Sequence, residues 1–157
     1  MKKILWTLFM LIICMGASAQ KKTKPADVQM PTSMRINMNE MMPTKYPMKV
    51  LDGSDYIIMR NDSIFANLPY VGDVHMASYG AGIPTDFDHP VLNMKKKNKK
   101  DGSLTLRFDV RHEMMTYRFD IQLYDNNRAN VVMSPSMADM VSYMGEWVDL
   151  NNPENAK

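Results

Sequence analysis

Two neighbouring stretches of alternating apolar and polar residues, within 104–124, constrain the fold of this chain more than any other feature. Every second residue is apolar over 104–111, and the same pattern returns over 117–123. Successive side chains of a β-strand point to opposite faces, so a period of two predicts two half-buried strands. The residues between them, 112–115, are expected to form the loop of a hairpin.

The charges on these two strands predict their register. A pairing that sets Asp109 opposite Arg118 also sets Arg107 opposite Asp120. A slip by two residues would instead place Arg107 opposite Arg118, a like-charge pair that is unfavourable by about 0.2–1 kcal/mol. On the other face the predicted register joins three apolar pairs: Val110 with Tyr117, Phe108 with Phe119, and Leu106 with Ile121.

A second hairpin is expected over 56–67, with Asn61-Asp62 as its two-residue turn. Both of its faces are apolar, so we expect both to be covered. Its second strand should end near Pro69, because proline has no N–H to donate to a neighbouring strand. The segment 134–147 is ambiguous, because it fits a helix with Ser134 as cap and Gly145 as stop, while its valine, tyrosine and tryptophan also suit a strand. We favour a strand in its second half. Further short strands are expected at 34–38, 48–51, 74–79, 91–95, 129–133 and 140–147.

Many short strands separated by turn residues predict an all-β protein with little helix. We expect a single antiparallel, meander-like sheet, or an open barrel or sandwich, of roughly seven to nine strands. The expected organisation is a signal peptide at 1–19, a flexible leader at 20–31, one β-rich domain at 32–150 and a flexible tail at 151–157.

The N-terminus has the three parts of an export signal. Two lysines precede an apolar run at 4–14, and Ala17-Ser18-Ala19 offers a cleavage site. The run is shorter than the roughly 20 apolar residues that span a bilayer, so no transmembrane segment is expected after cleavage. Cys14 is disfavoured as a lipid anchor because Ile13 stands where a small residue is expected. The sequence therefore predicts export to the periplasm or outer surface of a Gram-negative-type bacterium.

Cleavage changes the chemistry that remains. The only cysteine is lost, which excludes an internal disulfide or a thiol nucleophile in the mature chain. Two of the 19 basic residues leave with the signal and none of the 17 acidic ones, so the mature chain is formally neutral. A neutral chain argues against a nucleic-acid partner, which requires a strongly basic face.

The stretch LPYVGDVHMASYGAG, residues 68–82, is the main candidate for a binding site. Its glycines and its proline account for a change of chain direction. Tyr70 and Tyr79 are not needed for the turn, so we expect them to form a rim that faces a ligand. Asp73 and His75 would share one face of a strand. These four residues are the predicted ligand-binding residues, for an unknown small molecule or a partner in the cell envelope.

An enzyme is the competing hypothesis. A small hydrolase or lyase would use Asp73, His75 and His89, provided that the three side chains converge within hydrogen-bonding distance. No matching nucleophile is evident, so no catalytic residue is assigned. The sequence His112-Glu113 begins like a zinc-protease motif but lacks its second histidine and lies in a predicted turn, which excludes that motif.

The chain contains 18 methionines, and thioethers are ligands for Cu(I). Copper handling is therefore a further alternative. The candidate ligands form two groups in the sequence: Met34, Met38, Met41 and Met42, and His112, Met114 and Met115. Because the methionines are spread along the chain, we favour their use as core residues in place of leucine. No metal and no cofactor are expected.

The run KKKNKK at 95–100 could touch an anionic membrane surface or a polysaccharide. It directly precedes the strongest strand pattern. We therefore expect a solvated hairpin loop whose charges keep one end of the sheet soluble.

Three stretches resemble one protein family: NDSIFANLPYVGDVHMASYGAG at 61–82, RFDVRHEMMTYRFDIQLYDNNRANV at 107–131, and VSYMGEW at 141–147. They are similar to exported bacterial envelope proteins of family 4251 of the domains of unknown function, and the resemblance covers about 56–147. The resemblance implies a β-rich exported domain and brings no activity. The leading hypothesis is a non-catalytic binding or envelope-associated module.

Overall fold

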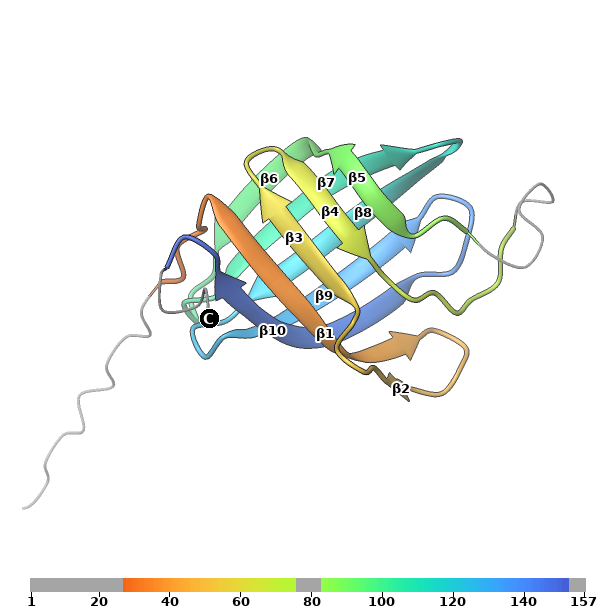
Figure 1. The fold of residues 1–157 in the computed structure, drawn as a ribbon, viewed down its shortest axis with the longest axis horizontal. Coiled ribbons are helices and arrows are strands. Elements are labelled where there is room, and N and C mark those ends of the chain that lie inside the picture. Colours follow the sequence, from red (N-terminus) through yellow and green to blue (C-terminus); the bar gives the residue numbers. More distant parts are fainter. Residues whose placement is uncertain (1–26, 76–82, 153–157) are drawn as a thin grey trace, which may run out of the picture.

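The computed structural model describes residues 27–75 and 83–152, and these residues form one antiparallel sheet of ten strands. The strands are β1 (Ser33–Pro43), β2 (Lys49–Val50), β3 (Tyr56–Arg60), β4 (Ser63–Asn67), β5 (Asp86–Pro90), β6 (Leu92–Asn98), β7 (Leu104–His112), β8 (Met115–Leu123), β9 (Arg128–Pro135) and β10 (Val141–Asp149). Their order is β5-β4-β3-β1-β10-β9-β8-β7-β6, with β2 paired to β1 (Figure 1). The described residues contain no helix, so the predicted all-β fold is confirmed.

The sheet curls until its two ends almost meet, which makes a nearly closed barrel (Figure 1). Only Val91 separates β5 from β6, the two end strands of the sheet. Phe87 of β5 reaches across the gap, with its ring edge-on to Tyr117 and Phe119 of β8 at centroid distances of 4.9 and 5.5 Å. We call the line where β5 meets β7 without strand pairing the seam. Side-chain packing closes the barrel there.

The predicted register of the hairpin at 104–124 is confirmed at every pair. Arg118 donates from Nε to Asp109 at 3.0 Å, and Arg107 forms an ion pair with Asp120 on the same outer face. On the inner face the Phe108 and Phe119 rings stack at 5.3 Å. The two strands are joined by Glu113 and Met114, and Glu113 adopts the positive φ that such a tight turn requires.

The hairpin at 56–67 is also confirmed, with its turn at Asn61-Asp62. The expectation that both of its faces are covered is wrong. Ile57 and Ile64 are fully buried, whereas Ile58 and Phe65 on the opposite face are only half-buried. One layer of sheet encloses one interior, so the second apolar face remains partly in contact with water.

Two expectations about strand positions need correction. The segment Asp86–Pro90, where no strand was expected, is strand β5 and pairs with β4. The expected strand at 74–79 is reduced, within the described residues, to a single bridge between Val74 and Ala138, and 76–79 lies outside them. The helix considered between Ser134 and Gly145 does not form, while the strand favoured for the second half of 134–147 does, as β10. Strand β4 ends two residues before Pro69, as expected.

The lysine run is also placed differently from the expectation. Residues 95–98 belong to β6, and the turn that leads to β7 covers only 99–103. Most of the run is therefore an edge strand. Lysines are common on such strands because their charge discourages pairing with another sheet.

The interior of the barrel contains four of the candidate copper ligands. Met34, Met38, Met41 and Met115 are fully buried among other apolar side chains, where they fill the core. Met114, at the tip of the β7–β8 turn, is 71% exposed.

The ends of the domain extend somewhat past the expected bounds. Val28, in the expected leader, is 6% exposed, and its N–H donates to the Gly102 carbonyl at 2.9 Å. At the other end Asn151 donates to the Ser33 carbonyl. The expected signal peptide at 1–19 and the last residues of the tail lie outside the described residues. In the part of the chain that is described, no helix is long and apolar enough to cross a membrane.

Candidate functional site

Three loops meet beyond the ends of β1, β4 and β9 and bring together most of the sequence-predicted site residues. The backbones of two of these loops are joined directly. Asp139 N–H donates to the Asp73 carbonyl at 3.0 Å, and His75 N–H donates to the Met137 carbonyl at 2.8 Å. We call the side chains gathered here the loop cluster: Lys45, Tyr46, Tyr70, Asp73, His75 and Asp139.

Lys45 lies between two carboxylates at the centre of the loop cluster. Its Nζ is 2.7 Å from Asp73 Oδ2 and 3.0 Å from Asp139 Oδ2. The hydrogen bonds and positive charge of Lys45 hold the pKa of both carboxyl groups below its usual value, and the Asp73 and Asp139 carboxylates raise the pKa of Lys45. Tyr46 completes the arrangement by donating its hydroxyl to Asp73 at 3.0 Å.

Tyr70 anchors the loop cluster to the barrel. Its hydroxyl donates to the Asp139 carbonyl at 3.0 Å, and its ring packs against the core. A Cβ at Gly72 would come within 2.4 Å of the Tyr70 hydroxyl, so only glycine leaves room for the tyrosine in this position. Burial, chiefly, raises the pKa of Tyr70 to about 12. Tyr79, its expected companion, lies outside the described residues.

The histidines do not gather in one place. His75 Nε2 is 3.3 Å from Asp139 Oδ1, and its side chain is 57% exposed. His89 lies on β5, and its Nε2 is 2.9 Å from Nδ1 of His112 at the seam. Among the described residues no hydrogen bond joins His89 to Asp73 or His75, so the convergence that the hydrolase hypothesis requires does not occur there. The same residues contain no group of three His, Cys, Asp or Glu side chains placed to hold a metal.

Sequence reasoning missed three members of the loop cluster. Lys45, Tyr46 and Asp139 are 28, 27 and 66 residues from Asp73, and the local sequence around Lys45 and Tyr46 gives no sign of a charged partner. One signal was available at Asp139. It is the one charged side chain in the stretch SPSMADMVSYM, residues 134–144. Burying a carboxylate without a charged or hydrogen-bonding partner lowers the stability of a protein, so a partner could have been expected.

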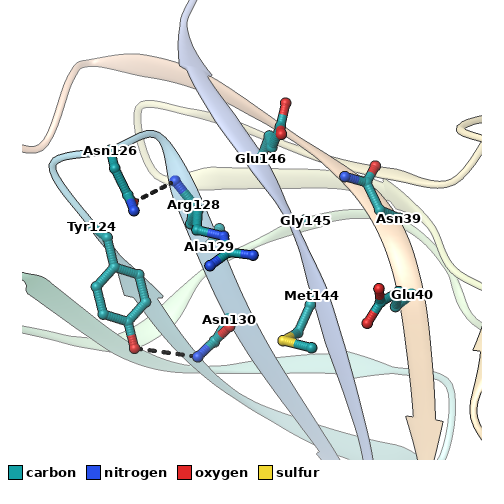
Figure 2. A pocket seen from close by; sticks show the side chains of 10 residues that line it. All are labelled: Asn39, Glu40, Tyr124, Asn126, Arg128, Ala129, Asn130, Met144, Gly145 and Glu146. Atoms are coloured by element: carbon teal, nitrogen blue, oxygen red, sulfur yellow. Dashed lines mark hydrogen bonds between the residues drawn. The ribbon is translucent and has the colours of Figure 1, made fainter.

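A second candidate is a groove on the outer face of the barrel, centred on Gly145 of β10 (Figure 2). Its volume is about 450 Å³. A Cβ at Gly145 would lie 2.0 Å from the Asn37 carbonyl oxygen, so the floor of the groove is backbone. Next to it, β1 bulges at Asn39, where the register shifts between Met38 and Glu40. The hollow lies over this close approach of β1 and β10 and beside the bulge.

The walls of the groove are polar and come from β1, β9, β10 and the turn before β9 (Figure 2). Tyr124 and Asn130 form one wall, and Asn130 Nδ2 donates to the tyrosine hydroxyl at 3.2 Å. The charged groups of the walls are the guanidinium of Arg128 and the carboxylates of Glu40 and Glu146. Within the described part of the chain, no ion pair or hydrogen bond engages these three groups.

The architecture defines a class: an antiparallel barrel, nearly closed by side-chain packing, with a polar groove on its outer face. The profile of the family described as "Domain of unknown function (DUF4251)" matches residues 20–147, and the chain belongs to this family. A crystal structure of a DUF4251 family protein from Bacteroides eggerthii DSM 20697 is similar, with a TM-score of 0.57. The two chains are 14% identical, and the match covers 76% of this chain and 81% of the other. At that identity the likeness shows the fold alone. No curated protein matches the chain.

Proposed function

We propose that this protein is a non-catalytic binding module of the bacterial cell envelope, and that the groove around Gly145 takes its ligand. One observation carries the proposal: Arg128, Glu40 and Glu146 line a hollow of about 450 Å³ with charged groups that have no partner inside the described protein. Hollows of about 300–1,000 Å³ are typical of small-molecule sites. In this groove one guanidinium, two carboxylates and the side-chain amides of the walls can form hydrogen bonds with a ligand.

The walls also indicate the chemistry of the ligand. They offer donors from Arg128 and Asn126 and acceptors from Glu40 and Glu146, beside the ring of Tyr124. A small polar molecule with both donors and acceptors, such as a saccharide or a short peptide, fits such a mixture better than an apolar one. The envelope location rests on the predicted signal peptide at 1–19.

The loop cluster is the less suitable site. Its carboxylates already accept hydrogen bonds from Lys45 and Tyr46, and the Tyr70 hydroxyl donates to a backbone carbonyl. A ligand would have to displace these bonds, which lowers the gain from binding. That Tyr70, Asp73, His75 and Tyr79 bind a ligand stays a prediction.

A titration of the ¹⁵N-labelled mature chain with mono- and disaccharides and with dipeptides tests the proposal. We expect amide shifts confined to Glu40, the turn before β9 and Glu146, with affinity about tenfold weaker in Arg128→Ala. Arg60→Ala is the matched control, since Arg60 is exposed at the far end of β3 and does not line the groove. Shifts centred on the loop cluster, or equal affinity in both variants, would refute the groove as the site.

A further inference from the structure

Among the described residues β6 is an end strand of the sheet and pairs with β7 alone, so one of its edges is open to further pairing. All of its residues except Met94 are exposed. Along an antiparallel pair of strands, residue pairs that exchange backbone hydrogen bonds alternate with pairs that do not. Lys99 N–H donates to the carbonyl of Ser103, its opposite residue, so Lys99 belongs to the hydrogen-bonded set. Lys95 and Lys97 therefore direct their backbone groups toward β7. Those of Lys96 and Asn98 point away from the sheet, where another chain can pair with them.

The side chains along this edge carry an uncompensated positive charge. Five lysines lie within 95–100, and none of them forms an ion pair with a described carboxylate. Among the described residues, a side-chain partner exists for Lys99 alone, and it is the neutral Gln122. The charges of Arg107 and Arg118, on the neighbouring strands β7 and β8, are balanced by the aspartates with which they form ion pairs. The net positive charge of this region therefore comes from the lysines.

The same charge excludes two occupants of the open edge. A second copy of β6 would bring lysines opposite lysines, and like charges opposed across a ladder are unfavourable. The N-terminal part of this chain is also basic, with lysines at 21, 22 and 24. An extended segment that carries acidic residues reverses the sign of the interaction and keeps the backbone pairing.

We propose that the open edge of β6 binds an acidic, extended polypeptide segment of a partner protein, which adds to the sheet as a further strand. The backbone groups of Lys96 and Asn98 supply the pairing, and Lys95 and Lys97, which share one face, select carboxylates. A hollow of about 440 Å³ beside Lys95, on the outer face over β6 and β7, receives one side chain of the incoming strand. This surface is separate from the groove around Gly145, and the proposal does not depend on that groove.

The test uses a fluorescein-labelled nine-residue peptide that alternates glutamate with valine, and fluorescence anisotropy with the mature chain. We expect saturable binding that weakens with salt, because exposed charges are screened. Lys97→Glu should weaken binding about tenfold, as one attraction is replaced by one repulsion. Lys49→Glu is the matched control, because Lys49 is an exposed lysine on β2 and its reversal should leave binding unchanged.

A second peptide separates strand addition from simple charge attraction. It has the same sequence with N-methyl groups on alternate residues, which removes the donors that must pair with β6. Loss of binding to this peptide supports strand addition, whereas equal binding overturns it. Binding to phosphatidylglycerol vesicles without binding to the first peptide would also overturn the proposal, and would assign the lysines to a membrane surface.

Discussion

The β7–β8 hairpin and the loop cluster both have ion pairs on the protein surface, but these ion pairs have different structural roles. In the hairpin, the Asp109–Arg118 pair lies on the outer face of strands whose inner face is the packed core. In the loop cluster, Lys45 joins two loops that share one isolated bridge and a few backbone bonds. In the hairpin the ion pairs lie on strands that the core already holds together, whereas in the loop cluster they connect separate loops.

Burial predicts where the stability resides. Exposed ion pairs contribute about 0–1 kcal/mol each, whereas a buried aromatic ring contributes several times more. The hairpin should therefore tolerate the loss of its charges and fail when its rings are removed. In the loop cluster the ion pairs join separate loops, so the loss of a charge should loosen those loops locally.

The largest expected effect is in the core beneath the hairpin. Phe119→Ala removes a ring that stacks on Phe108 and meets Phe87 across the seam, and should lower the free energy of unfolding by about 3–5 kcal/mol. Urea denaturation followed by tryptophan fluorescence measures this loss. Arg118→Met in the same strand should cost less than about 1 kcal/mol. Similar losses in the two variants would contradict the comparison.

A smaller effect is expected at high pH, beneath the loop cluster. Tyr143 is fully buried and donates to the Pro69 carbonyl at 2.7 Å, and burial raises its pKa far above the usual value, as it raises that of Tyr70 to about 12. A raised pKa contributes stability that is complete below the unfolded value of about 10 and is lost as the pH rises through the folded value.

Stability should therefore fall above about pH 10, and Tyr143→Phe should make that fall less steep. The variant loses its hydrogen bond to Pro69 and should be about 0.5–1.5 kcal/mol less stable at pH 7. Urea denaturation at a series of pH values measures both quantities. An unchanged alkaline slope in the variant would show that Tyr143 is not the group that titrates.

The smallest effect on overall stability, and the most local one, is expected from Lys45→Met. Without the lysine, the pKa values of Asp73 and Asp139 should rise toward the ordinary aspartate value, which carboxyl-detected NMR titration measures directly. Their lowered pKa values contribute stability above about pH 4 that is lost as the pH falls through the folded values.

The Lys45→Met variant should therefore depend less on pH in this acid range than the parent chain. Hydrogen exchange should become faster at the His75 and Asp139 amides, which join the loops, and stay unchanged in the hairpin. Unchanged exchange at those two amides would show that backbone pairing alone holds the loops together.

The difference between the two regions also explains what the sequence revealed. The hairpin register depends on partners 9 and 13 residues apart, so alternation and charge were enough to predict it. The strand β5 was missed because its sequence DFDHP places acids and a proline around one buried ring, Phe87. Its identity as a strand depends on remote contacts with β4 and β8, which no local pattern records.

The candidate sites were predictable only in part for the same reason. Tyr70, Asp73 and His75 were found because they lie close together in the chain, whereas Asp139 reaches them from 66 residues away. The groove around Gly145 combines three segments that are far apart in the sequence. In the sequence, Gly145 is equally suited to end a helix. Its real reason is the backbone carbonyl of Asn37 on β1, which leaves no room for a side chain and which no local pattern reveals.

The position of β1 has a consequence for the order in which the chain can fold. β1 lies in the interior of the sheet and pairs with the last strand, so that Met34 is opposite Asp149. As the chain is synthesised, β1 and the β3–β5 segment must wait for nearly the whole sequence before the barrel can be assembled. Such long-range pairing forms slowly. The barrel of such a chain can therefore close only when its synthesis is almost complete.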